Sequence, residues 1–292
     1  MRKPVETCIT TFSWVALFLL IASLFLLIAY LIQKGASSIQ LSLFFGDTNP
    51  VDALLLKRQV FDGLFPAIAG TFFLITSSML IAIPIGVAGG IYMAEYCKGQ
   101  LKPLFNLTFD ILAGVPSIVV GLAGLLLTIL LNRHFPEQIA PCLLLSCFCL
   151  ALLVLPYLIR TTQTALESID PLIRKTAPAL GASRSQNIIL VLLPHSINDI
   201  ISGIILATGR CAEDTAVIML TGVVATAGFP RSLFSQYEAL PFYIYYISSQ
   251  YTGPDELASG FGAAIILLLL CIGLLALALW IKRRFTTFLL FR

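Results

Sequence analysis

The chain has 292 residues, of which 58% are hydrophobic and only 11% are charged. Its net charge of +3 is too small to indicate a nucleic-acid partner. This composition excludes an ordinary soluble domain and is typical of a protein that crosses a membrane several times. The seven cysteines and two histidines show no metal-ligand spacing, so we expect neither a metal site nor a disulfide framework.

Six apolar segments are long enough to cross a bilayer. They cover residues 12–32, 66–93, 109–131, 139–159, 196–222 and 260–281. The first segment is too long for the apolar core of a signal peptide and lacks a clear cleavage site, so we interpret it as a retained transmembrane helix. The sequence therefore predicts an all-α polytopic membrane protein with six transmembrane helices, organised as one domain over residues 1–292.

The segment 66–93 contains Gly86, Gly89 and Gly90. Small residues let membrane helices approach each other closely, and we interpret these glycines mainly as packing positions. The alternative is that they form flexible gates in the wall of a pathway.

The lysines and arginines predict the orientation of the segments. If the N-terminus is inside the cell, twelve of them lie on the cytoplasmic side and five outside. The cytoplasmic set is Arg2, Lys3, Lys98, Lys102, Arg160, Arg174, Lys175, Arg184, Lys282, Arg283, Arg284 and Arg292. The outer set is Lys34, Lys57, Arg58, Arg133 and Arg231. We therefore expect both termini in the cytoplasm, with the basic tail at residues 282–284 anchored at anionic membrane lipid.

Three ionisable residues lie near the centre of segment 196–222, namely Arg210, Glu213 and Asp214. A charge at this depth costs at least ~2.5 kcal/mol, so such residues usually face a partner or a pathway. On a continuous helix, their spacing places all three on one face. Two roles stay open for Arg210: a structural ion pair with Glu213 or Asp214, and contact with a passing anion, whose oxygen pair matches the guanidinium fork.

The predicted cytoplasmic loop 160–195 contains signals for two short helices. Asp170 followed by proline is an N-cap followed by the first helical residue, and Gly181 can end that helix in a left-handed conformation. A second helix begins near Ser183 and is expected to end at Pro194. A protruding helix–turn–helix of this kind suits docking into a cleft of a soluble partner.

The spacing within this loop carries a family resemblance. The sequence KTA at 175–177 is followed by three residues, Gly181, nine residues and VLLP at 191–194. This resembles the signature of the inner-membrane permeases of ABC importers, which is EAA, three residues, Gly, nine residues and Ile-x-Leu-Pro. Lys175 departs from the pattern, because the family has glutamate there.

Further motifs are similar to permeases of phosphate importers of the PstA type. The segment RCAEDTA at 210–216 resembles their R-x-x-G-E-T-A, although Glu213 and Asp214 replace the Gly-Glu pair. The segments GGIYMAEY at 89–96 and GVPSIVVG at 114–121, and the Leu240–Pro241 region, are also similar. The resemblance covers about residues 60–285.

The resemblance implies a type I ABC importer permease fold with a cytoplasmic coupling helix, placed in a bacterial inner membrane. The implied function is that of the transmembrane subunit of an ATP-driven importer of inorganic phosphate. The implied partners are an ABC ATPase, a second homologous permease and an extracytoplasmic substrate-binding protein. The sequence contains no GxxxxGK[ST], so we expect the chain itself to bind no cofactor and the ATPase subunit to use the ATP.

Two groups of site residues follow from the resemblance. The expected substrate pathway contains Arg210, Glu213, Asp214, Thr215 and Ser117. The expected contact with the ATPase contains Lys175, Ala177, Gly181, Leu193 and Pro194.

Two alternatives to phosphate import remain. The additional carboxylate of Glu213 allows a permease for another oxyanion, such as sulfate, molybdate or a phosphonate. A more remote alternative is an intramembrane enzyme that uses Glu213 and Asp214 as catalytic acids. Such an enzyme should carry its two acids on two helices, whereas these residues are adjacent in one segment.

Overall fold

The computed structural model describes residues 2–55, 59–134 and 140–290. Apart from an isolated bridge between Val223 and Tyr237, the regular structure in these ranges is helical. Within these described ranges, six helical stretches are long and apolar enough to cross a membrane, which confirms the predicted all-α, six-span fold. They are Glu6–Ser38, Phe65–Tyr96, Ser117–His134, Leu143–Glu167, Arg184–Glu213 and Pro254–Arg284.

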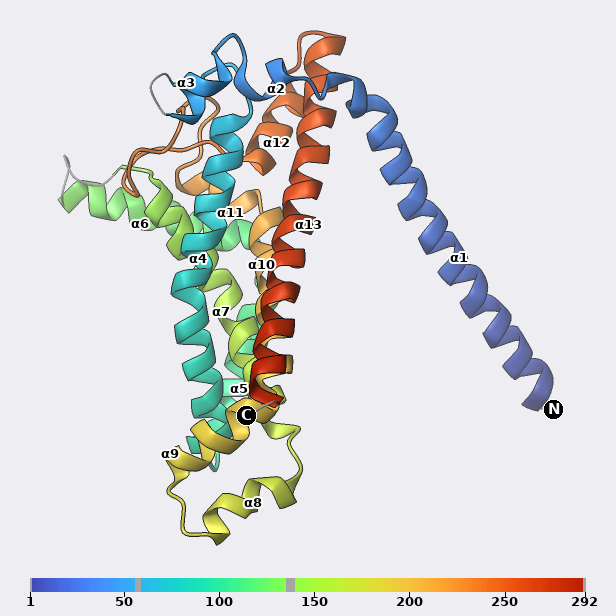
Figure 1. The fold of residues 1–292 in the computed structure, drawn as a ribbon, viewed down its shortest axis with the longest axis vertical. Coiled ribbons are helices and arrows are strands. Elements are labelled where there is room, and N and C mark those ends of the chain that lie inside the picture. The colour runs from blue at the N-terminus through green and yellow to red at the C-terminus, as the bar shows by residue number, and fades with distance from the viewer. Residues whose placement is uncertain (1, 56–58, 135–139, 291–292) are drawn as a thin grey trace.

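Four long helices form the body of the molecule: α4 (Phe65–Ile91), α7 (Leu143–Glu167), α10 (Leu193–Glu213) and α13 (Pro254–Leu290) (Figure 1). The central helix is α7, which packs against α4 and α10 and has the most buried apolar span. Glycines on α4 allow the close approach. A Cβ atom on Gly86 would lie 2.6 Å from Leu158 Cβ, as the packing interpretation of these glycines expects.

One end of the body carries the loop that resembles the importer signature. Here α4 continues into a π-helical turn, η2 (Tyr92–Tyr96), and α5 (Leu101–Ala113) follows. The protruding part consists of α8 (Pro171–Ala179) and α9 (Arg184–Asn187), at the bottom of Figure 1. A second π-helical turn, η3 (Ile188–Leu192), joins α9 to α10.

The opposite end is built from short helices. These are η1 (Ala36–Ser38), α2 (Leu41–Phe45), α3 (Pro50–Leu54) and α12 (Leu240–Gln250). From this end α1 (Arg2–Gly35) diverges from the body and runs back toward the level of α8 (Figure 1). It meets α13 near its own C-terminal end, where the rings of Tyr30 and Phe261 lie 5.9 Å apart edge to face.

Two of the predicted membrane segments are broken rather than continuous. In segment 109–131, α5 ends at Ala113 and α6 (Ser117–His134) begins after Pro116 and runs across the long axis of the body (Figure 1). Proline has no N–H to donate and disfavours helical backbone at the residue before it, which explains this break.

Segment 196–222 is broken at Asp214–Thr215. There α10 ends, Asp214 takes an extended conformation, and α11 (Ala216–Thr221) follows. The Asp214 side chain accepts a hydrogen bond from the Val217 N–H (3.0 Å), a local bond that competes with continuation of the helix.

Two further boundaries differ from the expectations. The second loop helix does not end at Pro194: residues 184–213 form one helical stretch, in which the wide turn of η3 precedes Pro194. The fourth segment, expected at 139–159, begins at Leu143 and extends to Glu167. Of the residues used to predict orientation, Lys57, Arg58 and Arg292 lie outside the described ranges.

Candidate functional site

The two helix breaks lie beside each other in the middle of the body. The segments that follow the breaks, α6 and α11, pack together in the same direction. A Cβ atom on Gly121 would lie 2.9 Å from the Ala216 carbonyl oxygen, and one on Gly124 would lie 2.7 Å from Thr221 Cγ2. Ser117 is one helical turn before Gly121, so this register places it at the level of the Asp214–Thr215 break.

The predicted charged residues are not arranged as the sequence suggested. Arg210 and Asp214 are half-buried and Glu213 is exposed. Because Asp214 has left the helix, the three residues do not share one helical face, and that prediction is wrong. Of the two roles left open for Arg210, the structural ion pair is not formed: within the described ranges, Arg210 has no carboxylate oxygen within 4.0 Å. The carboxylate of Asp214 instead accepts the bond from Val217.

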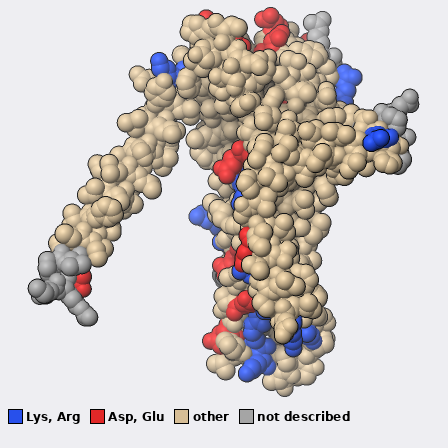
Figure 2. Space-filling model, turned by 180° about the vertical axis from the view of Figure 1, so that it is seen from behind, with Lys and Arg blue, Asp and Glu red and all other residues tan. Residues whose placement is uncertain are grey.

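A polar stripe extends from this region along α10. Its exposed polar members His195, Asp199, Ser202 and Glu213 recur at helical spacing, and half-buried Arg210 lies beside them. The exposed Leu206 interrupts the stripe between Ser202 and Glu213. Figure 2 shows a narrow file of acidic and basic side chains that descends from mid-body between large surfaces with few charged residues. Ionisable residues on a membrane helix are typical of a pathway or a subunit interface.

A groove of about 450 Å³ lies between α7 and α10, and the sequence did not predict it. It is lined by Tyr157, Arg160, Thr161, Thr164, Ala165, Ser168 and Asp199. The Nε of Arg160 lies 3.0 Å from Asp110 Oδ1 on α5, so this guanidinium is neutralised within the chain. The signal available in the sequence was the helical spacing of the hydroxyl-bearing residues along residues 157–168.

The loop that resembles the importer signature, residues 170–194, has the predicted capping. The N–H of Leu172 donates to Asp170 Oδ1 (2.7 Å) at the start of α8, and Gly181 has a left-handed φ of 85° after its end. Ser183 caps α9 in a reciprocal arrangement with Gln186. Leucines at positions 172 and 180 project from this loop with 76% and 89% of their surface exposed.

The structure separates the five predicted coupling residues into two sets. Lys175, Ala177 and Gly181 belong to the protruding α8 and its turn, where Lys175 and Gly181 are exposed. Leu193 and Pro194 are half-buried at the start of α10, and Leu193 packs against a core of Leu166, Ile188 and Leu192. The first set is available to a partner, whereas the second belongs to the stem of the loop.

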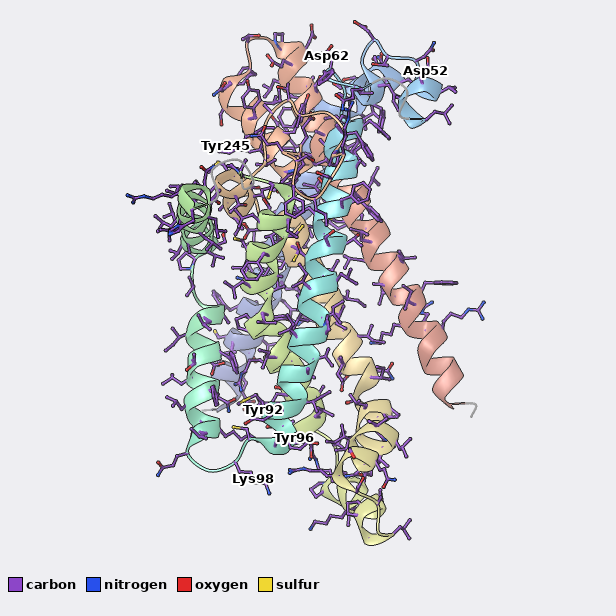
Figure 3. All side chains as sticks on the ribbon, turned by 90° about the vertical axis from the view of Figure 1, so that its left-hand side faces the viewer. Asp52, Asp62, Tyr92, Tyr96, Lys98 and Tyr245 are labelled. Atoms are coloured by element: carbon purple, nitrogen blue, oxygen red, sulfur yellow. The ribbon has the colours of Figure 1, made fainter. Side chains whose placement is uncertain are left out.

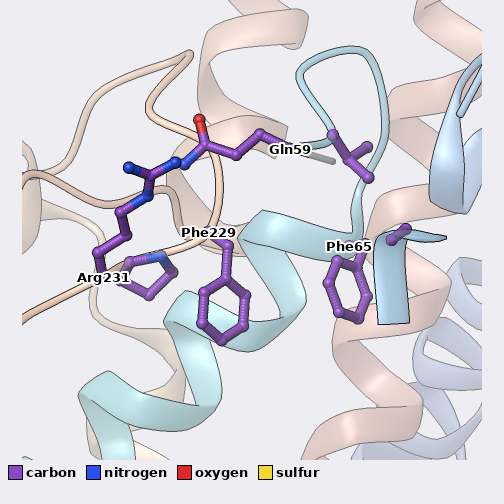
Figure 4. A pocket seen from close by; sticks show the side chains of 7 residues that line it. Gln59, Phe65, Phe229 and Arg231 are labelled. Carbon is purple, nitrogen blue, oxygen red and sulfur yellow. The ribbon is translucent and has the colours of Figure 1, made fainter. Parts of the chain in front are cut away.

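The opposite end holds a separate cavity of about 240 Å³ that contains none of the predicted site residues (Figure 4). It is lined by residues 53, 59, 60, 65 and 229–231. With the Gln59 amide turned toward Arg231, its oxygen accepts from Nε (3.0 Å) and Nη2 (3.2 Å) of the guanidinium. The rings of Phe65 and Phe229 stack beside them with centroids 6.1 Å apart.

The chain is similar to known transport proteins over most of its length. Residues 86–287 match the family described as binding-protein-dependent transport system inner membrane component. The probable ABC transporter permease protein YqgI of Bacillus subtilis is 31% identical over 265 residues, which is 86% of this chain and 86% of that protein. The phosphate transport system permease protein PstA of Haemophilus influenzae is 31% identical over 246 residues, covering 84% of this chain and 82% of PstA.

Solved structures show the same fold at lower identity. The MetNI methionine ABC transporter in an inward-facing conformation contains a chain with 19% identity and a TM-score of 0.53, covering 82% of this chain and 100% of that one. A bacterial ABC transporter that imports alginate contains a chain with 16% identity and a TM-score of 0.61, covering 91% of this chain and 96% of that one.

These relatives are transport components, so the enzyme alternative is answered and the protein is a transport subunit. The residues that match the family, 86–287, include the loop at 170–194, both helix breaks and Arg210. The chain belongs to the binding-protein-dependent transport family of inner-membrane components, and it is a multi-pass, PstA-like ABC transporter permease.

Proposed function

We propose that this permease is the transmembrane subunit of an ATP-driven importer of inorganic phosphate. The observation that carries the proposal is the meeting of two helix breaks beside Arg210. Irregular backbone at membrane depth is tolerated where it lines a cavity, and discontinuous helices form substrate sites in many transporters. The similarity to phosphate permeases, including PstA of Haemophilus influenzae, supports phosphate as the substrate.

Each predicted pathway residue has a role in this proposal. The guanidinium of Arg210 binds two oxygens of the passing anion, because it has no carboxylate partner within the described chain. The hydroxyls of Ser117 and Thr215, one at each break, donate to the anion in turn. Glu213 and Asp214 border the path and exclude a second anion by charge repulsion.

The charges of this chain alone do not favour an anion. Arg210, Glu213 and Asp214 sum to −1, so a second permease has to supply further positive charge across the pathway. The exposed polar stripe of α10 supports such a partner, since it would otherwise face lipid. The diverging α1 offers an apolar helix to the same partner and to membrane lipid.

The protruding loop is the proposed site for the ATPase subunit. Exposed Leu172 and Leu180 flank the exposed Lys175 on α8 and its turn, which gives a small apolar and basic surface that a cleft can cover. The ATPase binds and hydrolyses ATP, and this chain binds no cofactor. An extracytoplasmic substrate-binding protein delivers phosphate at the opposite end, where α2, α3 and α12 lie.

The proposed orientation places α8 and both termini in the cytoplasm. In a cysteine-free background, Ser183→Cys should be inaccessible to a membrane-impermeant thiol reagent added outside intact cells. Thr252→Cys, an exposed position at the opposite end, should react with it. Labelling at 183 and protection at 252 would reverse the orientation.

The substrate is tested in proteoliposomes that contain the complete transporter. We expect ATP-dependent uptake of radiolabelled phosphate that excess unlabelled phosphate abolishes and that sulfate, molybdate and a phosphonate do not. Competition by one of these three anions at equal concentration would instead favour the alternative oxyanion importer, which the additional carboxylate of Glu213 motivates.

Variants at Arg210 test the pathway. Loss of a charge-assisted hydrogen bond costs about 1.5–3 kcal/mol, so Arg210→Ala should lower uptake about tenfold or more. Arg210→Lys keeps the charge but loses the fork, and it should also be impaired. The matched control is Arg133→Ala, which removes an exposed arginine at the end of α6 and should leave uptake unchanged. If the double variant Arg210→Ala, Asp214→Ala assembles and transports at the parental rate, Arg210 has no role in the pathway.

A further inference from the structure

A partly buried ion pair connects α8, the proposed coupling helix, to the end of α4. The Nη1 of Arg174 on α8 donates to Glu95 Oε1 in η2 at 2.6 Å, across 79 positions of sequence. Only 9% of the Glu95 side chain and 25% of the Arg174 side chain are exposed. Arg174 is adjacent to Lys175, where the importer family has its signature glutamate. This ion pair is therefore within the loop signature but directed inward, away from the exposed face of α8.

Three further contacts hold the same junction. The Nη2 of Arg174 donates to the backbone carbonyl of Leu166 near the end of α7 (2.5 Å). The side-chain Nδ2 of Asn187 donates to the backbone carbonyl of Arg174 (3.1 Å), which closes the loop between α8 and α9. The guanidinium of Arg184 lies 4.6 Å from the centre of the Tyr96 ring, a cation–π contact from α9 back to η2. Figure 3 shows Tyr92 and Tyr96 at this end of α4, next to the α8–α9 segment.

The junction coincides with the two π-helical turns described above. Glu95 and Tyr96 belong to η2, and η3 follows directly after Asn187. Single π-helical turns inside longer helices occur often at functional sites, because the widened turn changes the direction of the side chains. Ile91 and Ala94, at the end of α4 and in η2, pack against the core that contains Ile188 and Leu192 of η3. Both turns therefore meet at one small interface.

The chain connects α8 covalently only to α7 and, through α9, to α10. The contacts at Glu95 and Tyr96 add a third, non-covalent connection, to α4. Helix α4 packs along α7 through close glycine contacts, so a displacement at η2 moves tightly packed helices rather than loose loops.

We propose that the Glu95–Arg174 ion pair is the mechanical link through which movement of the coupling helix reaches α4. This inference rests on the proposed function, because it assumes that α8 is moved by an ATPase. Glu95 and Arg174 act as positioning residues: they contact neither substrate nor nucleotide. Removal of Arg174 leaves the Glu95 carboxylate buried and unpaired. Removal of Glu95 leaves Arg174 bonded to the Leu166 carbonyl oxygen of α7 but no longer to η2, so in both cases α8 is released from η2 while its exposed docking face stays intact.

The test compares ATP hydrolysis with phosphate uptake in proteoliposomes of the complete transporter. In Glu95→Gln, hydrolysis should continue while uptake falls, so the number of ATP molecules hydrolysed per imported phosphate should rise about fivefold or more. The double variant Glu95→Gln, Arg174→Gln should be no worse than the worse single variant, because both changes break one link. If Glu95→Gln fails to assemble, Arg174→Gln serves the same test, since it removes the charged group that donates to Glu95.

A matched control is available at the same end of the molecule. Lys102 pairs with Glu167 at 2.7 Å, an ion pair between α5 and α7 that does not involve α8. Lys102→Gln should leave the ratio of hydrolysis to uptake unchanged. An unchanged ratio in assembled Glu95→Gln and Arg174→Gln, or a parallel fall of hydrolysis and uptake in both, would overturn the link. If the parental transporter itself shows no ATP-dependent uptake, the proposed function fails instead.

Discussion

The contact between α4 and α7 allows a quantitative prediction for Gly90→Ala. The new Cβ atom would lie 2.8 Å from both the Ile159 carbonyl oxygen and Thr162 Cγ2, and closer still to Thr162 Cβ. Ordinary contacts begin near 3.4 Å, and the carbonyl belongs to the backbone of α7, which cannot rotate away. Overpacking of this kind costs about 1–3 kcal/mol, and the several short contacts favour the upper end. Replacing a helical glycine by alanine stabilises the helix by about 1 kcal/mol, so the free energy of unfolding should fall by about 2 kcal/mol in total.

This loss corresponds to a factor of about 30 in the folding equilibrium. It can be measured by titrating the purified protein in mixed micelles with dodecyl sulfate and following the helical circular dichroism. The matched control is Gly273→Ala on α13, where a Cβ atom would have no atom within 4 Å. That variant should be as stable as the parent or slightly more stable. Equal free energies of unfolding for the two variants would refute the steric reasoning.

The turn after α8 and the carboxyl of Glu238 give two further predictions. Gly181→Val forces a β-branched residue into φ 85°, so it should misplace α8 and lower uptake at unchanged expression, whereas normal uptake by the assembled variant would contradict this. Burial raises the pKa of Glu238 to about 7 from its ordinary 4.5, although its carboxylate accepts from the N–H groups of Ala227 (2.8 Å) and Gly228 (2.7 Å). The folded chain therefore binds more protons than the unfolded chain between pH 4.5 and 7, so this residue's contribution to stability is present at pH 4.5 and is lost as pH rises through 7. Glu238→Gln should remove that part of the pH dependence, measured from pH 4.5 to 8, and identical pH profiles of variant and parent would refute the assignment.

The six spans and the capping of α8 could be predicted from the sequence because both depend on local signals. Apolar length sets the spans, and Asp170, Pro171 and Gly181 mark the ends of α8 at fixed offsets. The sequence does not predict the breaks, because average hydropathy does not distinguish a continuous helix from two apolar helices joined by two or three residues. Pro116 carried a signal for one of them.

The remaining differences depend on packing and on competition between local bonds. Asp214 could bond to Arg210 or to the N–H of Val217, and the local backbone geometry selects Val217. The spacing of these residues in the sequence does not predict that geometry. The link between Glu95 and Arg174 joins residues 79 positions apart, so only the folded arrangement of α4 and α8 reveals it. Pro194 predicts a helix end because a proline usually ends a helix, whereas in the structure a π-helical turn precedes it and the helix is continuous.

Because α1 diverges from the body, the folding stability of the subunit and the contacts of α1 within the bilayer can be changed separately. None of its apolar window is buried within the chain, and it touches the body mainly around Tyr30 and Gly35. Changes such as Phe18→Leu, at a side chain that is 72% exposed, therefore leave the internal stability of the subunit unaltered and act on whatever surrounds α1 in the bilayer. Substitutions on this helix are therefore constrained by its contacts with lipid and partner subunits, whereas substitutions on α4 and α7 are constrained by packing within the chain.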